Sequence, residues 1–158
     1  MLEGFKRYDI AIGTSSVSIT DNGIAFSKAA IIRMGKPEYV VFLMNENDKK
    51  IAIQKAEKND EGAIQFYTKK KNVSVRWNNK DLLKTITEMM NWKLSGNIYK
   101  AEGEYVSAEN AMIFDLKNAI QTKSKWYEHI GVYIKKAYGS PHRHFMELVK
   151  TKLFTRTP

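Results

Sequence analysis

The chain has 158 residues and no cysteine, 43% of its residues are hydrophobic, and its formal net charge is +9 at pH 7. This composition supports one ordinary core or two small lobes that share one, and it excludes a wholly disordered chain. The lack of cysteine excludes disulfides, thiolate zinc sites and cysteine nucleophiles. Because the apolar runs are much shorter than the roughly 18 residues that suggest a membrane span, we expect a soluble, cytoplasmic protein that does not enter membranes.

The positive charge is concentrated in the last part of the chain. Residues 1–60 contribute +1, residues 61–122 contribute +2, and residues 123–158 contribute +6. Such asymmetry is typical of a tail that binds an anionic partner, and equally of a tail that is simply solvated.

The first third of the chain predicts a strand, a short helix and a hairpin, in that order. Residues 17–20 alternate as a half-buried strand does, and turn residues follow at 21–23. Two apolar segments, 39–44 and 50–54, predict a hairpin around a polar turn. The expected helix has one face at helical spacing, ending at Gly35, that comprises Phe26, Ala29, Ala30, Arg33 and Met34.

A shift of 56 residues gives a second segment of the same character. A helix is expected over about 81–90, followed by a hairpin of residues 97–101 and 111–116 with Gly103 in its turn. Copied units of this length pack together because one unit cannot bury its apolar face alone, although chance agreement of residue classes is the alternative. The matched pairs are Val17 and Val73, Ile19 and Val75, Asn22 and Asn78, Phe26 and Leu82, Ala30 and Ile86, and Met34 and Met90.

The predicted fold is therefore α+β, with two tandem strand-helix-hairpin lobes packed as a β-barrel-like core. The first lobe is expected over residues 1–62 and the second over residues 63–122, with one shared core. A basic helical extension is expected over residues 123–158.

Residues 16–56 resemble the AbrB/SpoVT-type swapped-hairpin family, and residues 72–118 resemble it more weakly. That family runs strand, turn with glycine, short helix, Gly-Lys-Pro-like corner, strand, acidic turn and strand. The resemblance implies a transcription regulator or antitoxin whose paired halves form an interlaced β-barrel that binds DNA, and a tandem copy would supply both halves from one chain. The matching residues are 17–19, Gly23, 28–34, Gly35, Lys36, Pro37, 40–43, Asn47, Asp48 and 51–53.

The segment between the two expected lobes combines basic and aromatic residues. Phe66 and Tyr67 precede three lysines at 69–71, and Arg76 and Trp77 follow shortly after. Phosphate attraction and base stacking use such residues together, but the same composition also makes an ordinary exposed edge strand.

The tail, residues 123–158, is predicted to form two helices. Apolar residues follow helical spacing from Trp126 until Gly139, and Ser140 and Pro141 suit the start of a second helix. A strand over residues 126–138 is the alternative. If the tail is helical, it forms either a phosphate-binding surface with little base specificity or a basic pair that caps the lobes. The cations concerned are Lys135, Lys136, Arg143, Lys150, Lys152 and Arg156.

Catalytic chemistry has little support in the sequence. The three histidines, His129, His142 and His144, all lie in the tail, without an acidic cluster or a recognisable partner motif. The loop at residues 13–16 lacks the lysine and the spacing of a P-loop. We therefore expect no catalytic residue, no metal site and no cofactor.

The leading hypothesis is a nucleic-acid-binding regulatory protein of bacterial or mobile-element type, with DNA as its target. The alternative is a protein-interaction module, an inhibitor or adaptor, anchored by exposed aromatics at Tyr67, Trp77, Trp92, Trp126 and Tyr133. Monomer and homodimer both fit the sequence. The hypothetical nucleic-acid-binding residues are Lys69, Lys70, Lys71, Arg76, Trp77, Lys135, Lys136, Arg143, Lys150 and Lys152.

Overall fold

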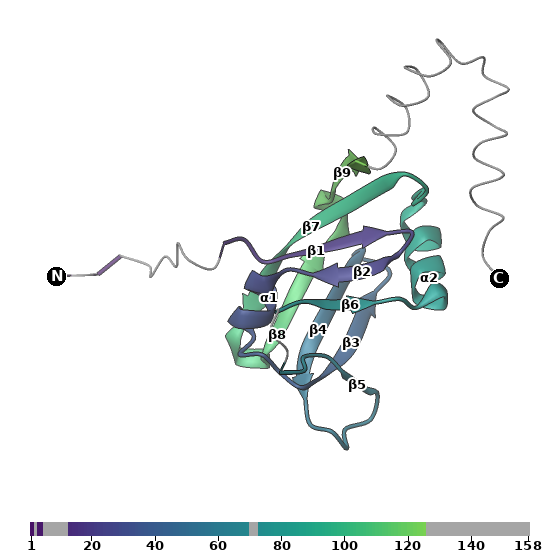
Figure 1. Ribbon diagram of the computed structural model, residues 1–158. Helices are drawn as coiled ribbons and strands as arrows, with labels where there is room; N and C mark the ends of the chain where they lie inside the picture. The colour runs from purple at the N-terminus through teal and green to yellow at the C-terminus, as the bar shows by residue number, and fades with distance from the viewer. Residues whose placement is uncertain (2, 5–12, 70–72, 126–158) are drawn as a thin grey trace, which may run out of the picture. The chain divides into compact units, whose positions relative to one another are not determined.

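The computed structural model describes residues 1, 3–4, 13–69 and 73–125 (Figure 1). Within them lie nine strands, two α-helices and two short 3₁₀ turns. None of the described helices is long and apolar enough to cross a membrane. The elements are β1 (Ser16–Thr20), β2 (Gly23–Phe26), α1 (Lys28–Arg33), β3 (Tyr39–Asn45), β4 (Lys50–Ala56), β5 (Ala63–Gln65), β6 (Val75–Trp77), α2 (Lys80–Met90), β7 (Asn97–Val106), η1 (Ser107–Glu109), β8 (Ala111–Asp115), η2 (Leu116–Asn118) and β9 (Ile120–Lys123).

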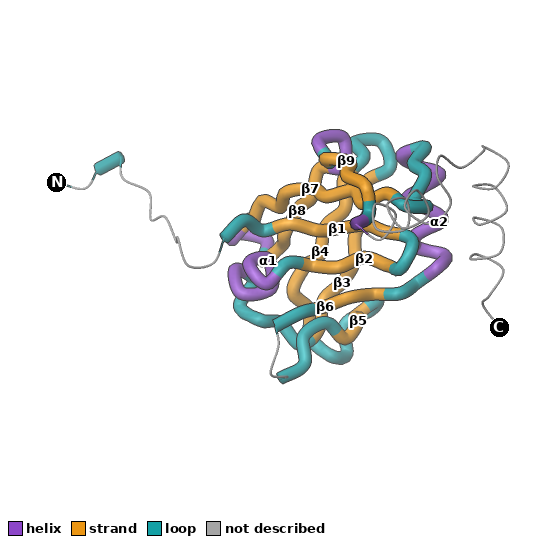
Figure 2. Tube along the Cα trace, turned by 45° about the horizontal axis from the view of Figure 1, so that its top comes forward, coloured by secondary structure: helices purple, strands orange, loops and turns teal. Residues whose placement is uncertain are grey.

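The strands form one sheet with the order β5-β3-β4-β8-β7-β1-β2-β6, and β9 pairs with β7. The pairings along this order are antiparallel. The sheet curls into a half-barrel, which Figure 2 shows most clearly. The expected α+β class and barrel-like core are therefore confirmed in this coarse form. Strands from the two halves of the sequence are interleaved, because β8 and β7 lie between β4 and β1.

β7 connects the two parts of the curled sheet. Its residues 99–102 pair with β1, and its residues 103–106 pair with β8. Gly103 stands where the partner changes, and a Cβ atom there would lie 2.5 Å from the ring of Phe114, its cross-strand partner. Glycine therefore lets the ring cover the backbone. The prediction that Gly103 lies in a turn was wrong, since β7 continues past it to η1.

The core contains a group of aromatic rings. The ring of Phe26 lies 5.2 Å from Phe66, 5.0 Å from Trp77 and 5.9 Å from Phe114, measured between centroids. Phe114 is fully buried. The two helices complete the core from opposite ends of the β1–β2 hairpin, as Figure 1 shows. The buried helical residues are Ala29, Ala30 and Ile31 of α1 and Leu83 and Ile86 of α2.

The turn predicted after the first strand is confirmed at residues 21–22, but it closes a hairpin whose returning strand was not predicted. Residues 23–26 return as β2, so Phe26 pairs with Val17 and does not belong to the helix. The helix begins at Lys28, after the N-cap residue Ser27, whose Oγ accepts a hydrogen bond of 3.2 Å from the N–H of Ala30. Placing Phe26 on the helix was therefore wrong, because the ring belongs to the strand's inward face.

Other expected elements are confirmed within a few residues. β3 and β4 form the first of the two expected hairpins, α2 covers the expected second helix, and β7 and β8 form the second expected hairpin. β2, β5 and β9 were not predicted. They are strands of four, three and four residues. The tail beyond residue 125 lies outside the described residues, and so do the helices or strand expected there.

The close approach of Gly23 to the backbone of Trp77 should have a measurable effect on stability. Its φ is +134°, and a Cβ atom would lie 2.3 Å from the carbonyl oxygen of Trp77. We expect Gly23→Ala to lower the free energy of unfolding by clearly more than about 1 kcal/mol, because backbone strain and a clash with β6 act together. Urea unfolding followed by circular dichroism measures the change.

Gly62→Ala is the matched control for this substitution. Its φ of +75° is also unfavourable for alanine, but nothing lies within 4 Å of the added Cβ. We expect this substitution to lower the free energy of unfolding by about 1 kcal/mol, through backbone strain alone. An equal loss at the two positions would mean that the approach of Gly23 to Trp77 has no energetic effect.

Candidate nucleic-acid interface

The structure separates the predicted interface residues that it describes. Lys69 is exposed shortly after β5, while Lys70, Lys71 and the five predicted tail residues lie outside the described ranges. Arg76 and Trp77 are consecutive in β6, so their side chains point to opposite faces of the sheet. Those two side chains therefore do not form one basic and aromatic surface.

Trp77 packs into the aromatic core. Its ring centroid lies 5.0 Å from Phe26, 5.9 Å from Phe42 and 5.8 Å from Phe66. Arg76 is exposed on the outer face of β6. The half-buried ring of Trp77 is therefore packed against the core by three aromatic neighbours and is not an exposed stacking surface.

Two of the other aromatics expected as exposed anchors are also packed. Tyr67 is buried, at 9% exposure. Trp92 stacks on Tyr99 with ring centroids 4.0 Å apart and planes inclined by 6°. The expectation that Tyr67 is exposed was wrong, because the chain after β5 turns inward. Trp126 and Tyr133 lie beyond the part of the chain that the structure describes.

Backbone hydrogen bonds bring the segment after β5 against the corner after α1. The N–H of Phe66 donates to the carbonyl of Glu38 at 2.7 Å, and the N–H of Tyr67 donates to the carbonyl of Pro37 at 3.1 Å. Lys69 follows two residues after the second bond. The Gly-Lys-Pro corner and the chain that leads to Lys69, which are far apart in the sequence, thus meet at one end of the half-barrel.

The corner follows from how α1 ends. The N–H of Gly35 donates to the carbonyl of Ile32, and the N–H of Lys36 donates to the carbonyl of Ile31, both at 2.9 Å. Gly35 and Lys36 have φ angles of 77° and 54°, so the chain reverses at two left-handed residues. Pro37 is then buried, and Lys36 remains exposed.

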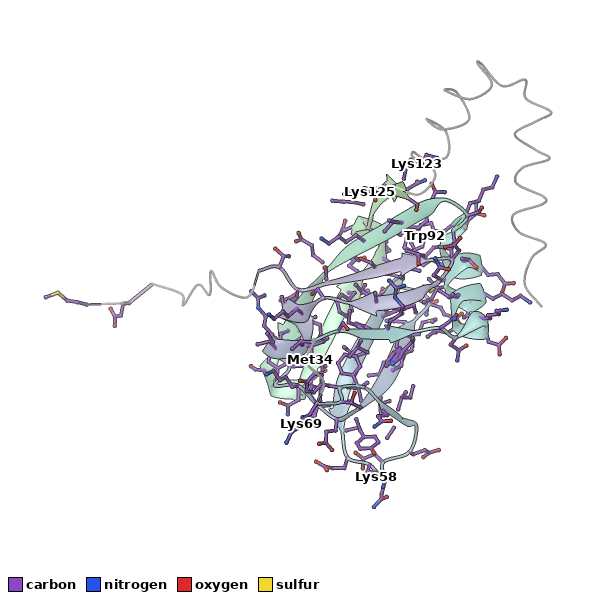
Figure 3. All side chains as sticks on the ribbon, in the orientation of Figure 1. Met34, Lys58, Lys69, Trp92, Lys123 and Lys125 are labelled. Carbon is purple, nitrogen blue, oxygen red and sulfur yellow. The ribbon has the colours of Figure 1, made fainter. Side chains whose placement is uncertain are left out.

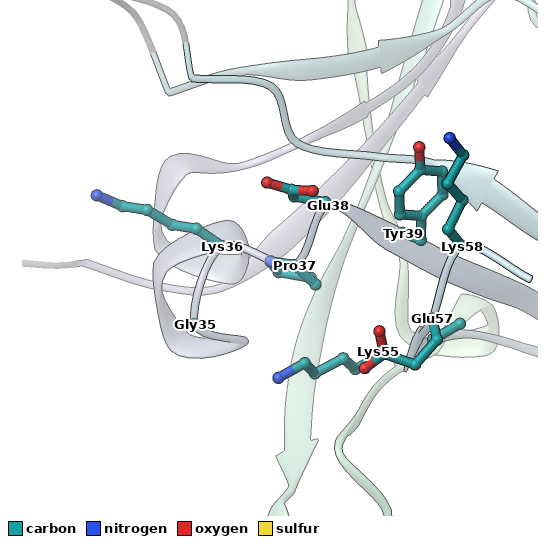
Figure 4. Close-up of a pocket in the computed structure, with 9 residues that line it drawn as sticks. Gly35, Lys36, Pro37, Glu38, Tyr39, Lys55, Glu57 and Lys58 are labelled. Atoms are coloured by element: carbon teal, nitrogen blue, oxygen red, sulfur yellow. The ribbon is translucent and has the colours of Figure 1, made fainter.

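A surface hollow of about 480 Å³ adjoins this corner (Figure 4). Its cationic side chains are Lys36, Lys55 and Lys58, and its acidic ones are Glu38 and Glu57. Figure 4 shows Lys36 and Lys55 extending to one side of the hollow, with Lys58 at the other. The remaining residues that line it are Gly35, Pro37, Tyr39 and Ala56.

The turn between β4 and β5 presents Lys58. The carboxylate of Asp60 accepts a hydrogen bond of 2.7 Å from the N–H of Glu57, and the N–H of Asp60 donates to the carbonyl of Glu57 at 3.1 Å. Asp60 thus stabilises the turn. Figure 3 shows Lys58 and Lys69 at the same end of the molecule, near β5.

We call Lys36, Lys55, Lys58 and Lys69 the basic corner. All four are exposed, and none forms a salt bridge with another residue of the described ranges. These four ammonium groups attract an anion, and the two carboxylates of the hollow reduce that attraction. Lys55 and Lys58 carried no signal in the sequence analysis, because the corner depends on contacts between distant segments.

Comparison with protein families, with curated proteins and with solved structures found no match. Within the described ranges, no group of three or more histidine, aspartate or glutamate side chains is placed to hold a metal ion.

Proposed function

We propose that the protein binds nucleic acid, with duplex DNA as its target, and acts as a regulatory protein of bacterial or mobile-element type. The observation that supports this most directly is the basic corner, where four exposed lysines that form no ion pair with any described residue come from three separate segments. The tail adds +6 over its 36 residues. Lysines contact phosphates as point charges, so this binding depends mainly on backbone phosphates and weakly on base sequence.

The proposal includes the scaffold that the sequence predicts. Two tandem strand-helix-hairpin units, as in the swapped-hairpin family that residues 16–56 resemble, would supply both halves of the binding scaffold from one chain. The tail would add a pair of basic helices. The interleaved sheet is compatible with this arrangement, because each half contributes strands on both sides of β7 and β8.

The test removes the three lysines of the hollow in the full chain. We expect K36Q/K55Q/K58Q to weaken binding to a labelled duplex and to reduce the slope of log K against log salt by about 2 to 3, since each phosphate contact contributes roughly 0.9. Fluorescence anisotropy at several salt concentrations measures the slope. Glutamine keeps most of the side-chain length, so the fold should be unchanged.

A matched triple variant separates the corner from overall charge. Lys80, Lys93 and Lys117 are exposed and lie outside the corner. K80Q/K93Q/K117Q removes the same charge, and we expect it to leave the slope nearly unchanged. Equal effects of both triples would contradict a localised corner, and failure of the unaltered protein to bind at low salt would contradict nucleic-acid binding altogether.

A further inference from the structure

Among the described strands the sheet ends at β6, which pairs there on one side only. Val75, Arg76 and Trp77 pair with Phe26, Ala25 and Ile24 of β2. No other described strand pairs with β6, which is the last strand in the sheet order. An edge of this kind offers backbone donors and acceptors to an added strand.

The opposite edge of the half-barrel is also partly open. β5 pairs only with residues 39–41 of β3, so the rest of β3 has β4 as its one described neighbour. The ring of Trp77 lies 5.9 Å from that of Phe42 on β3 and 5.8 Å from that of Phe66. Contacts between side chains therefore span the seam between β6 and β3. No pairing between described strands crosses it.

Trp77 retains an unused polar group at this seam. Its indole nitrogen is buried and has no hydrogen-bond partner among the described residues. The rings that surround it are apolar, so the interior side of the edge favours apolar side chains from a neighbouring strand.

The exterior side of the same edge is cationic. Arg76 is exposed and forms no salt bridge with a described residue. Arg76 is the first residue of a row of cross-strand partners on β6, β2, β1 and β7. Ala25 and Ser18 follow it in this row, and Lys100 is the last. An acidic side chain on an added strand, directly opposite Arg76, would form a favourable cross-strand pair.

The charge also argues against a second copy of this chain at the edge. Two antiparallel β6 strands paired about their centres would place Arg76 opposite Arg76. Like charges in directly opposite positions destabilise a strand pair. The edge therefore favours a different protein with complementary charge.

We propose that the free edge of β6 binds an extended segment of a partner protein, which joins the sheet as a further strand. Because side chains alternate between the two faces of the sheet, three consecutive residues of the segment should be apolar, acidic and apolar. Its acidic residue lies opposite Arg76, and its apolar residues face inward beside Val75 and Trp77. None of the four lysines of the basic corner belongs to β6, so the inference does not depend on the proposed nucleic-acid binding.

The experiment uses the full chain and two labelled, blocked peptides of equal length with Val-Glu-Val or Val-Lys-Val at their centres. We expect the glutamate peptide to bind about fivefold or more tightly than the lysine peptide, measured by anisotropy. In Arg76→Glu the preference should reverse, and in Arg76→Gln it should disappear. N-methylation of alternate backbone nitrogens on the bonding edge of the peptide should abolish binding.

Lys100→Glu is the control for net charge. It makes the same change of charge at the other end of the row, away from the edge, and the preference for the glutamate peptide should persist. The inference is overturned if no peptide binds, if Arg76→Glu leaves the preference unaltered, or if the methylated peptide binds equally well. A loss of DNA affinity in Arg76→Glu with unchanged peptide preference would assign Arg76 to the nucleic-acid surface instead.

Discussion

Phe114→Ala is expected to lower the free energy of unfolding by about 3–5 kcal/mol, because it removes a large side chain from a packed interior. Phe114 is fully buried and lies 5.9 Å from the ring of Phe26. It also covers Gly103 at the point where β7 changes its partner. The substitution thus leaves a cavity between the two parts of the sheet. Urea unfolding followed by circular dichroism measures the loss.

Leu43→Ala is the control, because Leu43 is 44% exposed on β3. We expect it to cost less than about 1 kcal/mol, since surface truncations change stability little. A similar cost at both positions would contradict the assignment of Phe114 to the centre of the core.

Gly103→Ala tests the same contact from the opposite strand. Alone, its Cβ would press on the Phe114 ring and cost about 1–3 kcal/mol. In the Phe114→Ala background the methyl group has room, so its cost should fall. Additive costs in this double-mutant cycle would mean that the ring and the glycine do not interact.

The elements that the sequence predicts well are those whose pattern is complete within one segment. α2 carries its apolar face and its Asn79 cap within its own residues, and the Oδ1 of Asn79 accepts the N–H of Leu82 at 3.0 Å. The hairpin of β3 and β4 has its own turn, where the Oδ1 of Asn45 accepts the N–H of Asp48 at 2.9 Å. Both residues of each of these contacts are close in the sequence, so the contacts can be predicted without knowledge of the tertiary fold.

The errors concern residues whose role depends on a distant partner. Phe26 fits the end of a helical face by spacing, yet its pairing with Val17 and its contacts with Phe66 and Trp77 place it in β2. Gly103 is typical of a turn, but the ring of Phe114 accounts for it inside β7. β5 and β9 are too short for periodicity to reveal, and they exist through pairing with β3 and β7.

The same distinction applies to the candidate site. The sequence identifies Lys69 as basic, but the hydrogen bond from Tyr67 to Pro37 decides which other lysines lie near it. The opposite directions of Arg76 and Trp77 were accessible to sequence reasoning, because Val75 and Trp77 alternate with Arg76 in one strand. The prediction grouped Arg76 and Trp77 as one basic and aromatic motif because it used only the composition of the segment.

Replacing the five predicted tail cations with glutamine is expected to have the largest effect on nucleic-acid binding. The residues are Lys135, Lys136, Arg143, Lys150 and Lys152. If each contacts a phosphate of a duplex, the slope of log K against log salt falls by about 4 to 5, because every contact releases roughly 0.9 of a counterion. Anisotropy titrations of the full chain, at salt concentrations from about 50 to about 200 mM, measure this slope.

A charge-preserving variant shows whether the tail acts through charge or through packing. Arginine at the four lysine positions keeps every cation, so binding to phosphates should persist with nearly the same slope. Combining the five glutamines with K36Q/K55Q/K58Q should add the two decreases in slope, provided that the corner and the tail contact the same duplex at once. A combined decrease no larger than that of the tail alone would show that the basic corner does not contact the DNA, and would leave the tail as the binding element.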